Sequence, residues 1–274
     1  MRAITLVLRM AVLSGLVLVL ASCGGGGSSS GGNTACSLLN AKIYNGQICS
    51  QTAQTPVVAL AVKMIDNSVQ VFCTGTLVTL DDILTSGHCL TQLMEASSEV
   101  ADFRVIVGGH DGQALSVVNA AIHPFYDGST GSRYDLAMLT LAQVPTPVIG
   151  PLPLLLSEIT GPGSVITAFG YGTTQDGTKG ELKAATFRVT NITDGNLVVT
   201  AENAGSASVC PGDSGGPAVY NSNGTATLAG VNSYIDTRNG ACVSTAAQTF
   251  GFVDIQNSAT LDFIALYAPD AAAW

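Results

Sequence analysis

Short apolar runs separated by turn residues recur along most of the chain from about residue 56 onward. The runs are rich in Val, Ile, Thr and Phe, which favour β-strands, and Asp-Gly pairs punctuate them. We expect strands over residues 56–64, 70–80, 103–107, 136–141, 164–169, 197–200, 227–231 and 250–255. The pattern predicts an all-β protein, built as a sandwich or as a pair of barrels.

The C-terminal segment follows a different spacing. Four apolar residues there are placed at i, i+3, i+4 and i+7: Leu261, Ile264, Ala265 and Ala268. This spacing puts them on one face of an α-helix, and Asn257 is a favourable N-cap before them. We therefore expect a helix over residues 257–268.

The first 22 residues have the pattern of an export signal. An apolar run of 12 residues, 10–21, follows Arg2 and Arg9. The run is too short to span about 30 Å of hydrocarbon as a helix, but it suits the core of a signal peptide. We expect residues 1–22 to be removed and exclude them from the fold.

The signal ends in Leu20-Ala21-Ser22-Cys23, which resembles the bacterial lipobox, and residues 24–32 are only Gly and Ser. In a lipobox the cut falls before the Cys, which then carries a lipid such as palmitate. We expect residues 23–42 to be a flexible tether and leader that anchors the protein at the bacterial cell envelope through Cys23. The alternative is an ordinary signal peptide that happens to end near a Cys, which would give a secreted protein.

Composition narrows the possible partners. The chain has 274 residues, enough for a large core, and only 11% of them are charged. Ten Lys and Arg stand against 19 Asp and Glu, a net charge of -9. Such a chain lacks the cations that neutralise phosphates, so we expect no nucleic-acid partner.

The cysteine count fits an exported protein. If Cys23 carries a lipid, six of the seven cysteines remain: Cys36, Cys49, Cys73, Cys89, Cys210 and Cys242. An even number indicates disulfides, and the sequence alone allows about 15 pairings of six.

Three stretches carry candidate chemistry, and none is decisive alone. They are 85–89 (Thr-Ser-Gly-His-Cys), 134–139 (Tyr-Asp-Leu-Ala-Met-Leu) and 210–217 (Cys-Pro-Gly-Asp-Ser-Gly-Gly-Pro). A Ser among glycines lets the backbone turn sharply and leaves N–H groups free to face a developing oxyanion. Taken singly, the Ser stretch is as well explained by a glycine-rich loop with an incidental Ser. The His stretch is as well explained by a structural His, and the Asp stretch by a turn Asp.

Together, in the order His, Asp, Ser, these stretches resemble the trypsin-like serine proteases of the chymotrypsin fold. Three flanking stretches also resemble that family: 73–77, 123–126 and 168–172. The resemblance covers residues 43–274 and implies two six-stranded antiparallel β-barrels, one over about 43–145 and one over about 146–255, followed by the C-terminal helix.

The resemblance also implies roles. Ser214 is the nucleophile, His88 the general base and acid, and Asp135 the group that orients His88. Ser233 matches the serine that hydrogen-bonds the buried Asp, and the N–H groups of Gly212 and Ser214 form the oxyanion hole. The chemistry needs no cofactor and no metal.

The remaining two histidines have no ligand-like partners in sequence. We expect His110 and His123 to have turn or core roles rather than to bind a metal.

Residues 42–46 resemble the family's activation site. Cleavage after Lys42 would free the ammonium of Ile43 to pair with Asp213 and order the loop beside it, since a buried carboxylate needs a partner. Tyr44 departs from the small aliphatic residue usual there. The alternative is a linker with no processing.

The resemblance implies two disulfides, Cys73–Cys89 and Cys210–Cys242. Cys36 and Cys49 are then the best remaining partners for each other. Their bridge would straddle Lys42 and keep the activated domain joined to its lipidated leader.

The resemblance places the floor of the specificity pocket at Ser208, where no acid is present to hold Lys or Arg. The pocket walls fall on Tyr234, Ile235 and Gly251, and Ile235 stands where Gly is usual. A branched side chain narrows the entrance, so we expect preference for small or medium apolar residues.

These observations predict a lipid-anchored, monomeric serine endopeptidase, kept as a zymogen, that acts on protein or peptide substrates. One alternative is a catalytically inactive, protease-like surface lipoprotein that acts as a binding module. Another is an esterase that uses the same site.

Overall fold

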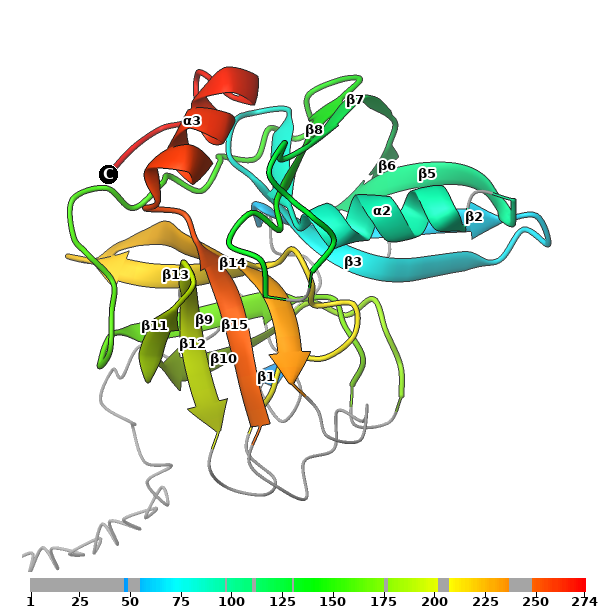
Figure 1. The fold of residues 1–274 in the computed structure, drawn as a ribbon. Coiled ribbons are helices and arrows are strands. Elements are labelled where there is room, and N and C mark those ends of the chain that lie inside the picture. The colour runs from blue at the N-terminus through cyan, green and yellow to red at the C-terminus, as the bar shows by residue number, and fades with distance from the viewer. Residues whose placement is uncertain are drawn as a thin grey trace, which may run out of the picture. The chain divides into compact units, whose positions relative to one another are not determined.

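A computed structural model gives the fold of the chain (Figure 1). The chain divides into two units, Met1–Gly32 and Asn33–Trp274. The structure describes residues 47–48, 55–96, 98–109, 112–129, 131–174, 177–201, 207–236 and 248–274. The predictions for Cys23, Cys36, Lys42, Ile43, Cys49, His110 and Cys242 lie outside the described residues. Within the described ranges, none of the helices is both long enough and apolar enough to pass through a bilayer.

The first half of the described chain forms one curled antiparallel sheet. Its strands are β2 (Val57–Met64), β3 (Val69–Leu77), β4 (Asp82–Thr85), β5 (Val100–Val107), β6 (Gln113–Leu115), β7 (Val117–Ile122) and β8 (Ala137–Leu141). They lie in the order β6-β5-β2-β3-β4-β8-β7. A helix, α2 (Gly87–Glu95), follows β4 directly.

The second half forms another antiparallel sheet, drawn in the lower part of Figure 1. Its strands are β1 (Gln47–Ile48), β9 (Val165–Gly170), β10 (Lys183–Arg188), β11 (Asn191–Thr193), β12 (Asn196–Ala201), β13 (Pro217–Ser222), β14 (Thr225–Asp236) and β15 (Gln248–Asp254). They lie in the order β1-β10-β9-β13-β14-β15-β12-β11. β1 precedes the first sheet in sequence but pairs with β10 in the second.

Strand β2 shows why the two sheets pack together. Val58 and Leu60 belong to the core inside the first sheet. Val57 and Ala59, on the opposite face, belong to a cluster shared with β9 and β14 of the second sheet. Both faces of β2 are therefore buried, which explains its continuous apolar run instead of alternation.

The C-terminal helix, α3 (Ser258–Tyr267), begins after an Asn cap: the side chain of Asn257 accepts a hydrogen bond from the N–H of Ala259. Phe263 and Ile264 are buried in the cluster between the sheets. The ring of Phe263 lies 4.9 Å from that of His123, so the helix joins the end of the chain to the first half.

The structure confirms two curled antiparallel sheets and a C-terminal helix. The sheets contain seven and eight described strands rather than six each. The additional short strands β6, β1 and β11 lie at sheet edges. Helix α2 was not predicted from the sequence, because most of its nine residues are polar or small and only Gly87, Cys89 and Leu90 are buried.

Candidate active site

The pairing of β4 with β8 brings His88 and Asp135 together. The strands are antiparallel, and Thr85 at the end of β4 lies opposite Ala137 at the start of β8. His88 comes three residues after Thr85, in the first turn of α2, and Asp135 comes two residues before Ala137. The two side chains therefore leave the sheet at the same end.

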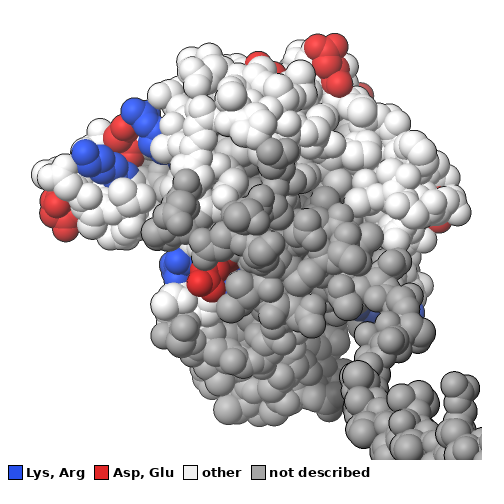
Figure 2. Space-filling view, turned by 180° about the vertical axis from the view of Figure 1, so that it is seen from behind, with Lys and Arg blue, Asp and Glu red and all other residues white. Residues whose placement is uncertain are grey.

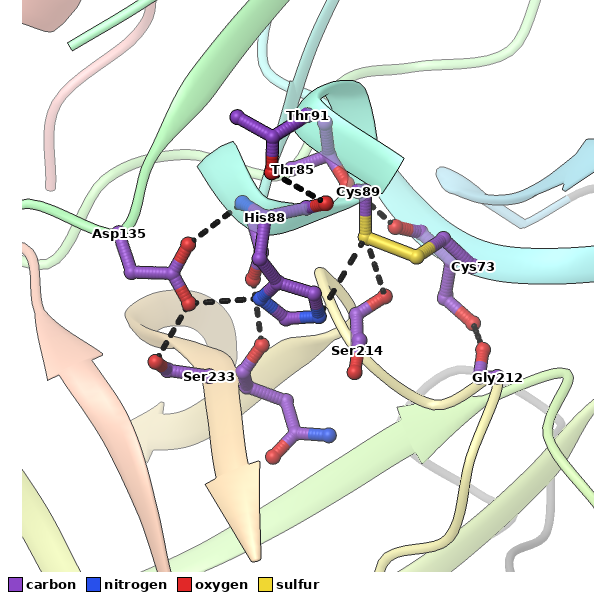
Figure 3. The surroundings of a disulfide bond; sticks show 12 residues. Cys73, Thr85, His88, Cys89, Thr91, Asp135, Gly212, Ser214 and Ser233 are labelled. Carbon is purple, nitrogen blue, oxygen red and sulfur yellow. Dashed lines mark hydrogen bonds and ion pairs between the residues drawn. A yellow bond between two sulfur atoms is a disulfide. The ribbon is translucent and has the colours of Figure 1, made fainter. Parts of the chain in front are cut away.

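Asp135 accepts hydrogen bonds from three donors (Figure 3). The backbone N–H of His88 lies 2.8 Å from Oδ1, and Nδ1 of His88 lies 2.8 Å from Oδ2. The hydroxyl of Ser233 donates to Oδ2 at 2.6 Å. Because an ionised carboxylate only accepts, the proton of a neutral His88 is on Nδ1, which leaves Nε2 as the basic nitrogen. The Asp135 side chain is 3% exposed and that of His88 is 19% exposed, so solvent reaches the imidazole but hardly the carboxylate.

A β-bulge in β14 directs Ser233 toward Asp135. The register of β14 against β15 shifts between Asn232 and Tyr234. Such a shift changes which side of the sheet a side chain faces. Beside it, the hydroxyl of Ser86 donates to the carbonyl of Asn232 at 2.6 Å instead of capping α2. The end of β4 is thereby tied to β14 of the other sheet.

Ser214 lies in the loop before β13, close to His88 (Figure 3). The Sγ of Cys89 is 3.8 Å from Nε2 of His88 and 3.8 Å from the carbonyl oxygen of Ser214. Among the described residues, no hydrogen bond joins the Ser214 hydroxyl to Nε2. Catalytic hydrogen bonds are often long without substrate and shorten when it binds.

Cys73 and Cys89 form a disulfide with an S–S distance of 2.01 Å. Their sulfurs and the ring of His88 lie within 4.8 Å of one another. They do not form a metal site, since disulfide sulfurs have no thiolate charge to offer a metal ion. For Cys210, which is buried, the predicted partner Cys242 lies outside the described residues.

His123 is buried among aromatic rings, 4.8 Å from the ring of Tyr134. Its Nε2 donates to the carbonyl of Ala259, and its Nδ1 accepts from the N–H of Phe125. Burial lowers the pKa of His123, which favours this neutral form.

The two predicted oxyanion donors belong to a tightly bent loop. Gly212 has φ +102° and Gly215 has φ +82°, conformations that suit glycine. A Cβ on Gly212 would lie 2.9 Å from Cα of Gly172, so a larger residue would also clash there. Gly212 and Ser214 flank Asp213 in the chain. Contacts that hold the Asp213 carboxyl group therefore also restrict the backbone between the two N–H donors.

Asp213 is fully enclosed. Its Oδ1 accepts from the N–H of Gly172 at 2.8 Å and its Oδ2 from the N–H of Cys210 at 2.8 Å. A Cβ on Gly170 or Gly172 would overlap the carboxyl group. Burial raises the pKa of Asp213 to about 6, and the two N–H donors oppose the rise.

Two lysine ammonium groups also lower the pKa of Asp213, by less than the two backbone N–H donors do. One belongs to Lys183, which is 3% exposed on β10 and donates to the carbonyl of Gly172 at 3.3 Å. The other belongs to Lys179. Sequence reasoning missed Lys183, because nothing in its local pattern marks it as buried.

The predicted pocket floor is buried. Ser208 is 0% exposed, and its hydroxyl donates to the neighbouring carbonyl of Val209 at 3.0 Å. The two residues that follow it, Val209 and Cys210, belong to the same apolar cluster as Phe250 and Phe252 of β15.

The predicted pocket walls lie on two paired strands, β14 and β15. Gly251 pairs with Tyr234, whose ring would collide with a Cβ on that glycine. The residue paired with Ile235 is Phe250, which was not among the predicted wall residues. Phe250 is 0% exposed and packs edge-on against Phe187 at 4.8 Å.

Charged side chains are sparse over the described part of the surface seen from behind (Figure 2). Lys and Arg lie there among Asp and Glu. Among the described residues, Arg104 and Asp102 form an ion pair 2.7 Å apart.

Comparisons with known proteins agree with this geometry. The family model described as Trypsin matches residues 43–255. The "Trypsin" of Saccharopolyspora erythraea is 29% identical over 188 residues, which cover 63% of this chain and 79% of that protein. Chymotrypsin-like elastase family member 1 of the dog is 31% identical over 190 residues, 60% of this chain and 70% of that protein. Vitamin K-dependent protein C of the mouse is 26% identical over 216 residues, 70% of this chain and only 46% of that protein.

A solved structure of HL collagenase superposes with a TM-score of 0.63 at 22% identity, over 82% of this chain and 97% of that one. At this identity the likeness shows a common fold. The family model, by contrast, spans most of the chain and includes His88, Asp135 and Ser214. The chain belongs to the family of trypsin-like serine proteases.

Proposed function

We propose that the chain is a serine endopeptidase that hydrolyses peptide bonds through an acyl-enzyme. The observation that carries the proposal is the hydrogen-bonded series from Ser233 through Asp135 to His88, next to the Ser214 loop. An imidazole with one nitrogen held by a buried carboxylate and the other left basic is equipped to take a proton from a serine.

The proposed steps assign one role to each of these groups. Nε2 of His88 accepts the Ser214 proton as Oγ attacks the substrate carbonyl, and Asp135 stabilises the resulting imidazolium. The N–H groups of Gly212 and Ser214 donate to the oxyanion. His88 then gives the proton to the leaving amine, the amine departs, and water attacks the acyl-enzyme by the same route.

Replacing Ser214 by Ala should abolish labelling by a fluorophosphonate probe and lower kcat by a factor on the order of 10⁴ or more. The reason is that the substitution removes Oγ, the atom that forms the acyl-enzyme in the proposed mechanism. The control is Ser68→Ala, at an exposed serine in the turn before β3, which should react as wild type does. Undiminished labelling or turnover in Ser214→Ala would refute the proposed nucleophile.

One observation favours a second candidate, a binding module without catalysis. Ser208 and Phe250 are both 0% exposed, so neither side chain presents an open surface to a substrate. One relative 30% identical over 158 residues is named "Glucanase inhibitor protein 4". Folded protein that no fluorophosphonate labels, cleaved or uncleaved, would favour this candidate.

We propose cleavage after small or medium apolar residues rather than after Lys or Arg. Ser208 offers no charge to a buried cation, and burial of an unpaired cation is costly. Ile235 is paired with Phe250 across β14 and β15, and its branched side chain would narrow the entrance of the proposed pocket.

A panel of chromogenic peptide amides tests this preference. We expect kcat/KM for Ala or Val at the cleaved position to exceed that for Phe or Arg by at least about tenfold, since one or two buried methylenes already give such ratios. Ile235→Gly should raise the Phe-to-Ala ratio by removing side-chain volume. Efficient cleavage after Arg would contradict the pocket assignment.

We also propose activation by cleavage after Lys42. The supporting observation is that Asp213 is enclosed and its pKa is raised to about 6, as expected for a carboxylate with too little compensation. An ammonium group on Ile43 would provide that compensation. It would also fix the loop that holds Gly212 and Ser214.

The pH dependence of stability tests the role of Asp213. Its pKa is about 6 in the folded chain against 3.8 as the reference value, so the folded chain binds the proton more tightly. The free energy of unfolding should fall as pH rises from about 4 to about 6, by up to about 3 kcal/mol from this group. Urea unfolding of an uncleaved Lys42→Gln chain, with and without Asp213→Asn, measures this fall.

The fall should be smaller in the Asp213→Asn chain, where burial still raises the pKa of Asp254. It should also be reduced after cleavage, because the ammonium of Ile43 then stabilises the charged carboxylate. Cleavage should also raise the rate of fluorophosphonate labelling. Equal pH slopes in the two uncleaved chains would count against the role of Asp213. Full activity without cleavage would count against activation.

We propose that Cys23 carries a lipid that holds the protein at the bacterial envelope. The motif at 20–23 and the Gly/Ser tether support this. The Cys23→Ala protein should lose the mass of the lipid and move from the membrane to the soluble fraction, whereas Ser30→Ala should not.

The proposed bridge between Cys36 and Cys49 has a separate test. If these two cysteines pair, the wild-type domain cleaved after Lys42 should leave the membrane only when the disulfide is reduced. Release before reduction would refute that pairing.

A further inference from the structure

Thr74, on β3, has an unusual number of buried hydrogen bonds. Its side chain and backbone are 0% exposed. Its hydroxyl donates to the carbonyl of Gly212 at 2.7 Å and accepts from the N–H of Tyr171 at 3.0 Å. Its backbone N–H donates to the carbonyl of Ser214 at 2.8 Å. One residue of the first sheet thus binds three residues of the second half of the chain.

Two of these partners carry the proposed oxyanion donors. The carbonyls of Gly212 and Ser214 belong to the peptide groups that follow those residues, on both sides of Asp213. Fixing both carbonyls restricts the backbone rotations at Gly212 and Ser214, and therefore the directions of their N–H groups. Gly212 needs this restraint most, because at φ +102° a glycine has other accessible conformations.

The third partner connects Thr74 to the surroundings of Asp213. Tyr171 lies between Gly170 and Gly172, and the N–H of Gly172 donates to the Asp213 carboxyl group. The Thr74 hydroxyl therefore lies between the segment that holds Asp213 and the loop that contains it. The hydroxyl donates its one proton to the Gly212 carbonyl and accepts the N–H of Tyr171 with one of its lone pairs.

We propose that Thr74 is a positioning residue for the oxyanion hole: its hydroxyl holds the Gly212 peptide so that the N–H groups of Gly212 and Ser214 face the developing oxyanion. This inference rests on the proposed peptidase function. Without the hydroxyl, the buried carbonyl of Gly212 and the buried N–H of Tyr171 both lose a partner. Leaving such groups unsatisfied is costly, so the peptide group between Gly212 and Asp213 turns toward another partner. That rotation changes the backbone angles on both sides of it, and the N–H groups of Gly212 and Ser214 lose their directions.

β3 offers a matched control. Thr76 is also 0% exposed, two residues further along the strand, and its hydroxyl has no hydrogen-bond partner among the described residues. Thr→Val preserves the shape of the side chain and removes only the hydroxyl. Thr74→Val and Thr76→Val therefore make the same chemical change. Only Thr74→Val removes a hydrogen bond to the loop that contains Gly212 and Ser214.

The experiment measures kcat and KM on the best amide substrate, and the Ki of a peptidyl trifluoromethyl ketone, whose adduct with Ser214 mimics the oxyanion. We expect Thr74→Val to lower kcat about 10- to 100-fold with KM changed less than threefold, the range seen when oxyanion donors are lost. Ki should rise by a similar factor. Thr74→Ser, which keeps the hydroxyl, and Thr76→Val should both stay within threefold of wild type. The pH midpoint of kcat should not move, because Thr74 does not touch His88.

Several outcomes would overturn the proposal. One is a folded Thr74→Val protein with unchanged kcat, and another is a loss of kcat without a matching rise in Ki. If Thr74→Val does not fold, Thr74→Ala removes the same hydroxyl with less bulk beside Gly216 and should show the same losses. If neither folds, Thr74 acts through overall stability and the positioning role is wrong. Wild-type protein that neither cleaves peptides nor reacts with fluorophosphonate refutes the proposed function itself, and the inference with it.

Discussion

Hydrogen bonds between buried groups of the two sheets hold the active-site residues in register. Thr74 bonds the Ser214 loop, Ser86 bonds Asn232, and Ser233 bonds Asp135. Each joins a residue of the first half to one of the second, and a buried donor or acceptor left without its partner costs about 1–3 kcal/mol. A displacement of one sheet along the other would break all of these bonds together. The apolar cluster between the sheets supplies adhesion, while these polar contacts determine the single alignment in which His88, Asp135 and Ser214 lie close together.

Asp213 adds a second constraint, which acts on the same loop from the other side. Its carboxyl group fits only because Gly170 and Gly172 leave room for it, and its charge is costly in that enclosure. The loop before β13 is therefore held in two ways. Neutral hydrogen bonds from Thr74 hold the carbonyls of Gly212 and Ser214, and the carboxyl group of Asp213 lies between these two residues in the chain. In the proposed mechanism, the neutral bonds set the direction of the N–H groups, and the charge state of Asp213 sets how firmly the loop stays in place. In the proposed activation, this separation would let one loop be both preformed and switchable.

The sequence predicted the features that are encoded locally. Apolar runs marked the strands, the i, i+3, i+4 spacing marked α3, and short motifs marked His88, Asp135 and Ser214, which β4, β8 and the loop before β13 bring together. The features that were missed depend on register or on distant contacts. A bulge between Asn232 and Tyr234 sets which residue of β15 pairs with Ile235, and that residue is Phe250. The partners of the Thr74 hydroxyl, Tyr171 and Gly212, are 97 and 138 residues away in the chain. No local sequence pattern reveals hydrogen bonds between residues so far apart.

The proposed pocket and the proposed activation site constrain each other. A pocket with Ser208 at its floor and Phe250 beside it excludes the long cationic side chain of Lys, yet activation requires a cut directly after Lys42. An enzyme with this pocket does not process its own leader efficiently, so its activation depends on a protease of different specificity. If the leader is also held to the domain by the Cys36–Cys49 bridge, that cut changes the charge around Asp213 without changing where the enzyme is located. Control of activity then lies with the second protease, and control of position lies with the lipid anchor.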